Sequence, residues 1–343
     1  MRLVLCGITA YEFWRSSLSI VPPDFRGFLN TSKLTDFLHD TCADVNKLLV
    51  NTGGSLSTDL HLLVESQQER RIAPHIICHS VPAGTRLPKG SIYQISDEIA
   101  VVSPGLCFLQ LVSEFDDLAL ARAGCDLTAL YRRDATRNRD LIQLDDAAFT
   151  KQDLLDYLAS VPDYRGAKHA MRIASWVLDR ARSPREVSMA MLMNMPTKAG
   201  GYGFPDLKAN QIIQLSDELQ ALARREHLEC DILLPNGDML EYNSSTHHDT
   251  DEELEFDFEK IATLQTMQRT VIPVSTRQFN DFDKFDTIMR GVNSCLRIKR
   301  KVGDSVLARR RGLHEQLLNA EKAQRFEENL LDTARWRLVV AHG

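Results

Sequence analysis

The sequence has no Cys-x-x-C pair, although it contains seven cysteines. They stand singly and their number is odd, which is typical of reduced thiols rather than of a disulfide framework or a zinc knuckle. Reduced thiols predict a cytoplasmic protein. The seven are Cys6, Cys42, Cys78, Cys107, Cys125, Cys230 and Cys295.

Long hydrophobic runs are also missing. No stretch approaches the roughly 18 apolar residues that a membrane-spanning helix needs, so we expect no membrane partner. The first apolar stretch, residues 3–10, is short and contains Gly7. We interpret it as the start of a folded domain rather than as a signal peptide.

The chain has no excess of positive charge. Its 41 Lys and Arg residues stand against 47 Asp and Glu residues, and the formal net charge is −6. This balance argues against a uniformly basic nucleic-acid-binding protein, so any such role must rest on a local patch. With 343 residues, 43% of them hydrophobic, the chain is long enough for two domains with separate cores.

Residues 1–135 predict an N-terminal α+β module. Short runs of strand-like composition are separated by Pro and Gly, and a helix is expected to begin at Ser103-Pro104 and to reach about Leu118. Another helix is expected over residues 34–50. The strand-like runs are residues 76–78, 91–95 and 99–102.

Residues 136–182 predict a linker with bridging helices. The stretch 132–146 is polar and rich in Arg and Asp. Amphipathic spacing then predicts helices over residues 151–160 and 166–182. These helices lead into a second module.

Residues 183–295 predict a mixed α/β sheet with helices against it. Ser183 suits the N-cap of the first helix, Pro184 suits the first helical position, and Glu186 completes a capping box. This helix is expected to end near residue 195. A hairpin, an acidic helix over residues 249–269 and a strand over residues 271–274 follow.

The hairpin is the most informative segment. Its turn, Pro235-Asn236-Gly237, suits a three-residue loop with the glycine in the left-handed conformation. That loop pairs Asp231 with Glu241 on one face of the ladder, where a divalent cation would offset the repulsion between them. A two-residue loop made of the Asn and the Gly is the alternative, and it would put the two carboxylates on opposite faces.

The order of these signals resembles the PD-(D/E)XK nuclease superfamily, and more narrowly its branch related to very-short-patch-repair endonucleases. The resemblance covers about residues 183–290 and rests on Glu186, Asp231 and Glu241 in that order. It implies a restriction-endonuclease-like sheet in which these three acids are catalytic. Asp231 and Glu241 would hold Mg²⁺ or Mn²⁺ beside a DNA phosphate. A capping role alone also explains Glu186.

Several neighbouring residues bear on activity. The superfamily places a lysine two residues after the second strand acid, where this chain has Asn243, which cannot serve as a general base at neutral pH. His247, followed by His248, is the candidate general base, although both histidines also suit an exposed loop. Lys260 could supply the missing cation, or it could simply lie on the surface of an acidic helix.

Residues 296–343 predict a C-terminal basic helical region. Its positive side chains are candidates for DNA phosphate contacts, although a solvated helix face explains the same charges. The candidate nucleic-acid-binding residues are Lys299, Arg300, Lys301, Arg309, Arg310 and Arg311.

Residues 1–135 also resemble, more faintly, the region that precedes this domain in abortive-infection antitoxin-like proteins. The resemblance rests on residues 9–14 and 102–104, and it implies a protein partner for the N-terminal module. Together the signals predict an α/β, metal-dependent DNA endonuclease of phage defence or DNA processing. The alternative is a catalytically inactive nuclease fold that binds DNA or protein as an antitoxin or regulator does.

Overall fold

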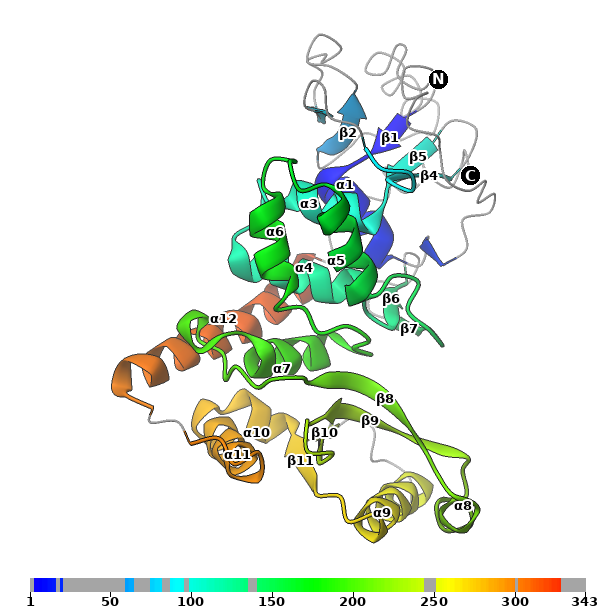
Figure 1. Ribbon diagram of the computed structural model, residues 1–343, viewed down its shortest axis with the longest axis vertical. Helices are drawn as coiled ribbons and strands as arrows, with labels where there is room; N and C mark the ends of the chain where they lie inside the picture. The colour runs from blue at the N-terminus through cyan, green and yellow to red at the C-terminus, as the bar shows by residue number, and fades with distance from the viewer. Residues whose placement is uncertain are drawn as a thin grey trace. The chain divides into compact units, whose positions relative to one another are not determined.

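The computed structural model describes residues 3–16, 19–20, 59–64, 75–81, 87–95, 99–134, 141–243, 251–299 and 302–327. Within these ranges the protein is mixed α/β (Figure 1), which confirms the expected fold class. The chain divides into a first unit, residues 1–175 with 324–343, and a second unit, residues 176–323. The helix expected over residues 34–50 lies outside the described residues.

The first unit contains a five-stranded sheet in the order β3-β2-β1-β5-β4. The central strands β1, β2 and β5 are buried at every position, as expected for apolar runs covered on both faces. The pairs β1–β5 and β2–β3 are parallel, and β1–β2 and β4–β5 are antiparallel. The strands are β1 Leu3–Leu5, β2 Leu60–Val64, β3 Ile76–Ser80, β4 Ile92–Gln94 and β5 Ile99–Val102.

The described helices of the first unit are α1 Gly7–Arg15, α3 Pro104–Leu111, α4 Asp117–Leu127, α5 Lys151–Ser160 and α6 Ala167–Ala174. The single helix expected from Ser103 to about Leu118 is wrong, because the chain breaks after α3 and Asp116 caps a new helix by accepting the Ala119 N–H at 2.8 Å. The expected linker at 132–146 contains a two-stranded sheet, β6 Tyr131–Arg133 with β7 Leu141–Gln143.

Helices α5 and α6 belong to the first unit rather than to a bridge. The Tyr157 hydroxyl of α5 lies 2.9 Å from that of Ser91, and Asp117 of α4 pairs with His169 and Arg172 of α6 at 2.7 and 3.0 Å. The boundary between units therefore falls after residue 175, inside the segment that was expected to connect them.

The second unit contains a four-stranded sheet in the order β11-β10-β9-β8. The pairs β8–β9 and β9–β10 are antiparallel, and β10–β11 is parallel because α9 intervenes as a crossover. The strands are β8 Lys208–Gln214, β9 His227–Leu233, β10 Met239–Asn243 and β11 Val271–Ser275. Helices α8 and α9 pack against each other (Figure 1).

The helices of the second unit are α7 Pro184–Asn194, α8 Asp217–Ala223, α9 Asp251–Thr266, α10 Thr276–Asn280, α11 Phe282–Cys295 and α12 Asp304–Glu327. The second unit extends to residue 323 and so includes most of α12, which was expected to lie in a C-terminal region at 296–343. Leu313 and Leu317 are buried, and the His314 ring lies 2.6 Å from the Phe279 carbonyl oxygen.

The hairpin between β9 and β10 has the three-residue loop. The Leu234 N–H donates to the Asp238 carbonyl at 2.8 Å, and Gly237 has a φ of +86°. Leu240 pairs with Ile232 in the ladder that follows. The predicted register is therefore confirmed, and the two-residue alternative is wrong.

The six cysteines within the described ranges are free thiols. No helix in these ranges combines the length and the apolar composition needed to cross a bilayer.

Replacing Gly237 by alanine is expected to lower the free energy of unfolding by about 1–2 kcal/mol. The left-handed backbone penalises a Cβ, which would also meet the Arg269 guanidinium. Gly312, inside α12, is the matched control, because a Cβ there has nothing within 4 Å. Gly312→Ala should stabilise the protein by about 0.5–1 kcal/mol. Urea unfolding measures both, and equal effects would contradict the turn geometry.

Candidate functional site

The confirmed register places three polar residues of the second unit in a row across the sheet. The ladder ends with the pair Leu240–Ile232, and the same register brings Glu241 beside Asp231, whose side chain accepts the Tyr242 N–H. On the other edge of β9, the pairs Ala209–Ile232 and Gln211–Cys230 flank Asn210, which therefore lies opposite Asp231. Laterally adjacent residues share a face of a sheet. Asn210, Asp231 and Glu241 thus form one polar row on three neighbouring strands.

Glu186, at the start of α7, is held against this row. The Asn210 side-chain amide donates to its Oε2 at 2.8 Å, and the Arg182 N–H donates to the same oxygen at 2.9 Å. The Ser183 hydroxyl donates to Oε1 at 2.9 Å and accepts the Glu186 N–H at 3.2 Å. Ser183 caps the helix as expected, but the Glu186 carboxylate accepts the N–H of Arg182 and not the N–H of the cap residue, as a capping box would require. Glu186 therefore both caps its helix and belongs to the cluster.

The carboxylates of Asp231 and Glu241 are only partly neutralised: Lys260 acts on both, the Tyr242 N–H acts on Asp231, and the Asp231 N–H acts on Glu241. The Tyr242 N–H donates to Asp231 Oδ2 at 2.7 Å. The Lys260 ammonium, from α9, donates to Glu241 Oε2 at 2.7 Å, and the two side chains are only 16% and 12% exposed. In the described part of the chain, the second oxygen of Glu241, Oε1, is buried and has no hydrogen-bond partner.

Burial and mutual repulsion together disfavour the ionised carboxylates. Burial, followed by the charge of Asp231, raises the pKa of Glu186 to about 7 and that of Glu241 to about 7. Burial also raises the pKa of Asp231, while the Tyr242 N–H and the Lys260 charge oppose the rise. At neutral pH the three acids therefore carry less total negative charge than three exposed carboxylates would carry.

Arg182 flanks the cluster on its outer side. Its guanidinium pairs with Glu229 at 2.8 Å, and Glu229 lies two residues before Asp231, on the same face of β9. The contributions of Arg182 and Asn210 were not predicted. Asn210 has a left-handed backbone, with φ of +45°, which interrupts the regular strand at the residue that bonds to Glu186. A single Asn in a strand-like stretch of sequence does not reveal this distortion.

The remaining predicted site residues are dispersed. Asn243 lies two residues after Glu241 on β10 and pairs with Ser275. Lys299 and Arg309 are exposed. Arg311 pairs with Asp283 at 2.7 Å. His247, Arg300 and Lys301 lie outside the described residues.

Arg310 was expected to contact DNA, and this expectation is wrong. The residue is 2% exposed, its guanidinium lies 4.2 Å from the centre of the Tyr202 ring, and it is 3.6 Å from the Asp286 carboxylate. Consecutive residues of a helix point about 100° apart, so the three arginines cover about 200° of the surface of α12, and the middle one faces the core. The middle arginine of this run belongs to the core.

The cluster offers few ligands to a metal. Among the residues that the structure describes, no group of three or more His, Cys, Asp or Glu side chains is arranged to hold a metal ion. Glu186 is occupied by three hydrogen-bond donors. Asp231 and Glu241 are therefore the two candidate ligands, with Lys260 as the neighbouring cation.

Comparison with known proteins assigns no family to this chain. No protein-family model matches it, and neither a curated protein nor a solved structure matches it.

Replacing Asp231 by asparagine is expected to stabilise the protein at pH 8 by about 1–3 kcal/mol and to change little at pH 4.5. Carboxyl groups with raised pKa hold protons that the unfolded chain has released, so stability falls as pH rises from about 4.5 towards 7. The Asp231→Asn substitution removes the negative charge that helps to raise the pKa of both Glu186 and Glu241.

Urea unfolding at the two pH values measures this effect. Glu218→Gln, which removes an exposed carboxylate on α8, is the control and should show no such pH dependence. An Asp231→Asn protein that is less stable than the unmodified protein at both pH values would contradict the repulsion described here.

Proposed function

We propose that the second unit is a metal-dependent nuclease domain that hydrolyses DNA phosphodiester bonds at the row formed by Asp231 and Glu241. The observation that carries the proposal is the buried, unpartnered Oε1 of Glu241 beside a second carboxylate. A buried acceptor without a donor is costly, and a bound cation would remove that cost. The resemblance to PD-(D/E)XK nucleases points to the same two residues.

These ligands fit Mg²⁺ or Mn²⁺. Mg²⁺ takes oxygen ligands, retains several waters and is commonly bound through one or two carboxylates together with substrate phosphates. A site of two carboxylates completed by DNA is therefore consistent with the lack of a three-ligand group in the described ranges. When bound, the ion would neutralise charge on the phosphate and lower the pKa of a water.

The protein's own residues would orient and balance the site. Lys260 holds one oxygen of Glu241 at 2.7 Å and keeps the carboxylate fixed while the other oxygen is available as a ligand. Asn210 and the Arg182 N–H fix Glu186 near the row. This position beside the row suits Glu186 to orient a water or to accept its proton during hydrolysis.

A specific contact favours the alternative, a nuclease fold that binds without turnover. The Lys260–Glu241 ion pair already supplies a cation to the cluster, and Asn243 lacks the charge of the superfamily's lysine. A protein of this kind would bind DNA or a protein partner whether or not a divalent ion is present. For either function we propose a cytoplasmic location, supported by the free thiols of the six described cysteines.

The metal site is tested by calorimetric titration of Mn²⁺ and Mg²⁺ into the full-length protein, with and without a DNA duplex. We expect binding that the Asp231→Asn, Glu241→Gln double variant loses, because both ligand charges are gone. The matched control is Asp217→Asn with Glu218→Gln, which removes the same charge from the first turn of α8. Loss of binding in this control as well would mean that only net charge matters.

Glu241→Gln is expected to slow Mn²⁺-dependent DNA cleavage by at least about 100-fold, or roughly 2.7 kcal/mol in the barrier. Cleavage of supercoiled and linear DNA on gels measures the rate. Metal binding without cleavage by the unmodified protein would select the alternative. Equal cleavage by the variant would show that the assigned ligand is wrong.

Lys299→Ala with Arg309→Ala is expected to weaken DNA binding and to reduce the slope of log affinity against log salt by about 1.8, since each phosphate contact contributes about 0.9. Both residues are exposed. Lys284→Ala with Arg290→Ala is the control, because these cations pair with Asp281 and Asp286 at 3.0 and 3.3 Å. Fluorescence anisotropy of a labelled duplex measures the slopes, and identical slopes would remove these two residues from the interface.

A further inference from the structure

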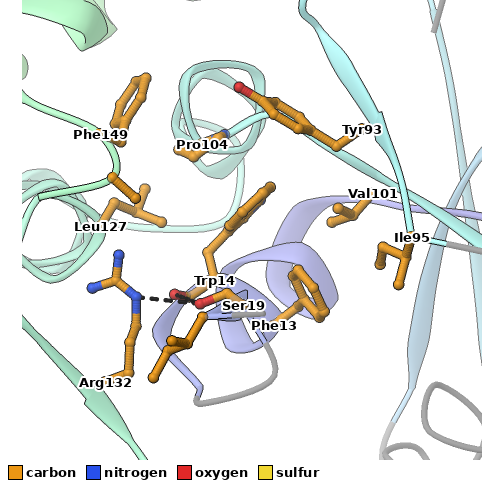
Figure 2. A pocket seen from close by; sticks show the side chains of 12 residues that line it. Phe13, Trp14, Ser19, Tyr93, Ile95, Val101, Pro104, Leu127, Arg132 and Phe149 are labelled. Carbon is orange, nitrogen blue, oxygen red and sulfur yellow. Dashed lines mark hydrogen bonds between the residues drawn. The ribbon is translucent and has the colours of Figure 1, made fainter. Parts of the chain in front are cut away.

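The first unit contains a cavity of about 450 Å³ that the nuclease proposal does not use (Figure 2). Its size is within the range of roughly 300–1,000 Å³ that is typical of small-molecule sites. Aromatic and aliphatic side chains form most of its lining, and they come mainly from α1, β4, β5, α3, α4 and the segment after β7. The residues important here are Phe13, Trp14, Tyr93, Leu127, Phe149 and Arg132.

The aromatic wall of this cavity is fixed by its own contacts. The Trp14 ring makes edge-on contacts with Phe13 and Tyr93, with ring centres 5.2 and 5.4 Å apart. Its indole N–H donates to the Val102 carbonyl at 2.7 Å, which sets the orientation of the ring. The wall is therefore apolar and already formed, so a ligand with a flat apolar body would bind without reorganising it.

Arg132 is the charged group of the cavity. Its side chain reaches from β6 towards Leu127 and Ser19 in Figure 2, although the residue is only 3% exposed. Nε donates to the Ser19 hydroxyl at 3.3 Å, and Nη1 donates to the carbonyl oxygens of Ala129 and Tyr131 at 3.0 and 2.7 Å. These bonds hold the guanidinium in place through Nε and Nη1.

The second terminal nitrogen of the guanidinium, Nη2, has no acceptor among the described residues. Within the described residues, Nη2 makes no hydrogen bond and no carboxylate forms an ion pair with Arg132. The acid whose charge acts on it, Asp126, accepts the hydroxyls of Tyr11 and Tyr131 at 2.6 Å each. An arginine stays protonated in proteins, so this guanidinium, with no paired carboxylate among the described residues, offers a fixed positive charge to an anion in the cavity.

We propose that this cavity binds a small organic carboxylate with a flat, apolar body. The carboxylate accepts hydrogen bonds from Arg132, and the body packs against Trp14, Tyr93 and Phe149. Arginine and carboxylate match in shape, which gives orientation as well as affinity. The proposal concerns the first unit alone and does not depend on nuclease activity in the second.

The test is calorimetric titration of the full-length protein with 2-naphthoate and with its neutral isostere 2-naphthamide. We expect the carboxylate to bind at least about 10-fold more tightly than the amide, because only the carboxylate forms charge-assisted hydrogen bonds with the guanidinium. Arg132→Gln should abolish this preference. Arg172→Gln removes the same charge from an exposed position of the same unit and should preserve it.

Equal binding of the two compounds to the unmodified protein, or binding of neither at millimolar concentration, would overturn the proposal. Arg132 also bonds to two backbone carbonyls, so Arg132→Gln could unfold the unit. A second variant, Ala148→Trp, then decides the matter, because Ala148 is an exposed residue of the cavity lining. It should block 2-naphthoate while leaving Arg132 intact, and unchanged binding would place the compound elsewhere.

Discussion

The second unit depends on the burial of three carboxylates that repel one another. Glu186, Asp231 and Glu241 come from one helix and two strands, and the register of a single hairpin brings the last two together. Burial raises the pKa of each. Such a cluster lowers stability unless hydrogen-bond donors and cations offset the repulsion between the carboxylates. The residues around the cluster supply these donors and this positive charge.

The compensation is unequal across the cluster. Glu186 has donors to both oxygens, and Asp231 has the Tyr242 N–H. Glu241 has Lys260 on one oxygen and, in the described part of the chain, nothing on the other. Unsatisfied buried polar atoms are uncommon in folded proteins and are often found at functional sites. The second oxygen of Glu241, Oε1, has no donor among the described residues, and this is the reason to propose a bound cation there. The ion pair between Lys260 and Glu241 already supplies one positive charge, and this is the reason to keep a non-catalytic alternative.

The first unit shows the opposite electrostatic situation. Its cavity buries a cation rather than anions, and Arg132 is held through three hydrogen bonds while its remaining terminal nitrogen has no acceptor in the described ranges. In each unit a buried charge is only partly compensated, and the sign of that charge selects the ligand class. Carboxylates favour a divalent cation in one unit, and a guanidinium favours an organic anion in the other.

The sequence alone was enough to predict the turns and helix starts that depend on neighbouring residues. The turn Pro235-Asn236-Gly237 fixed the hairpin register, and Ser183-Pro184 fixed the start of α7, because backbone conformation and capping depend on adjacent residues. The same rules did not foresee the break at Asp116 or the hairpin of β6 and β7. They also did not reveal that Arg310 is buried, that Lys260 pairs with Glu241, or that Arg132 faces a cavity. Those outcomes were decided by tertiary structure, because burial and charge pairing depend on residues that are distant in the sequence.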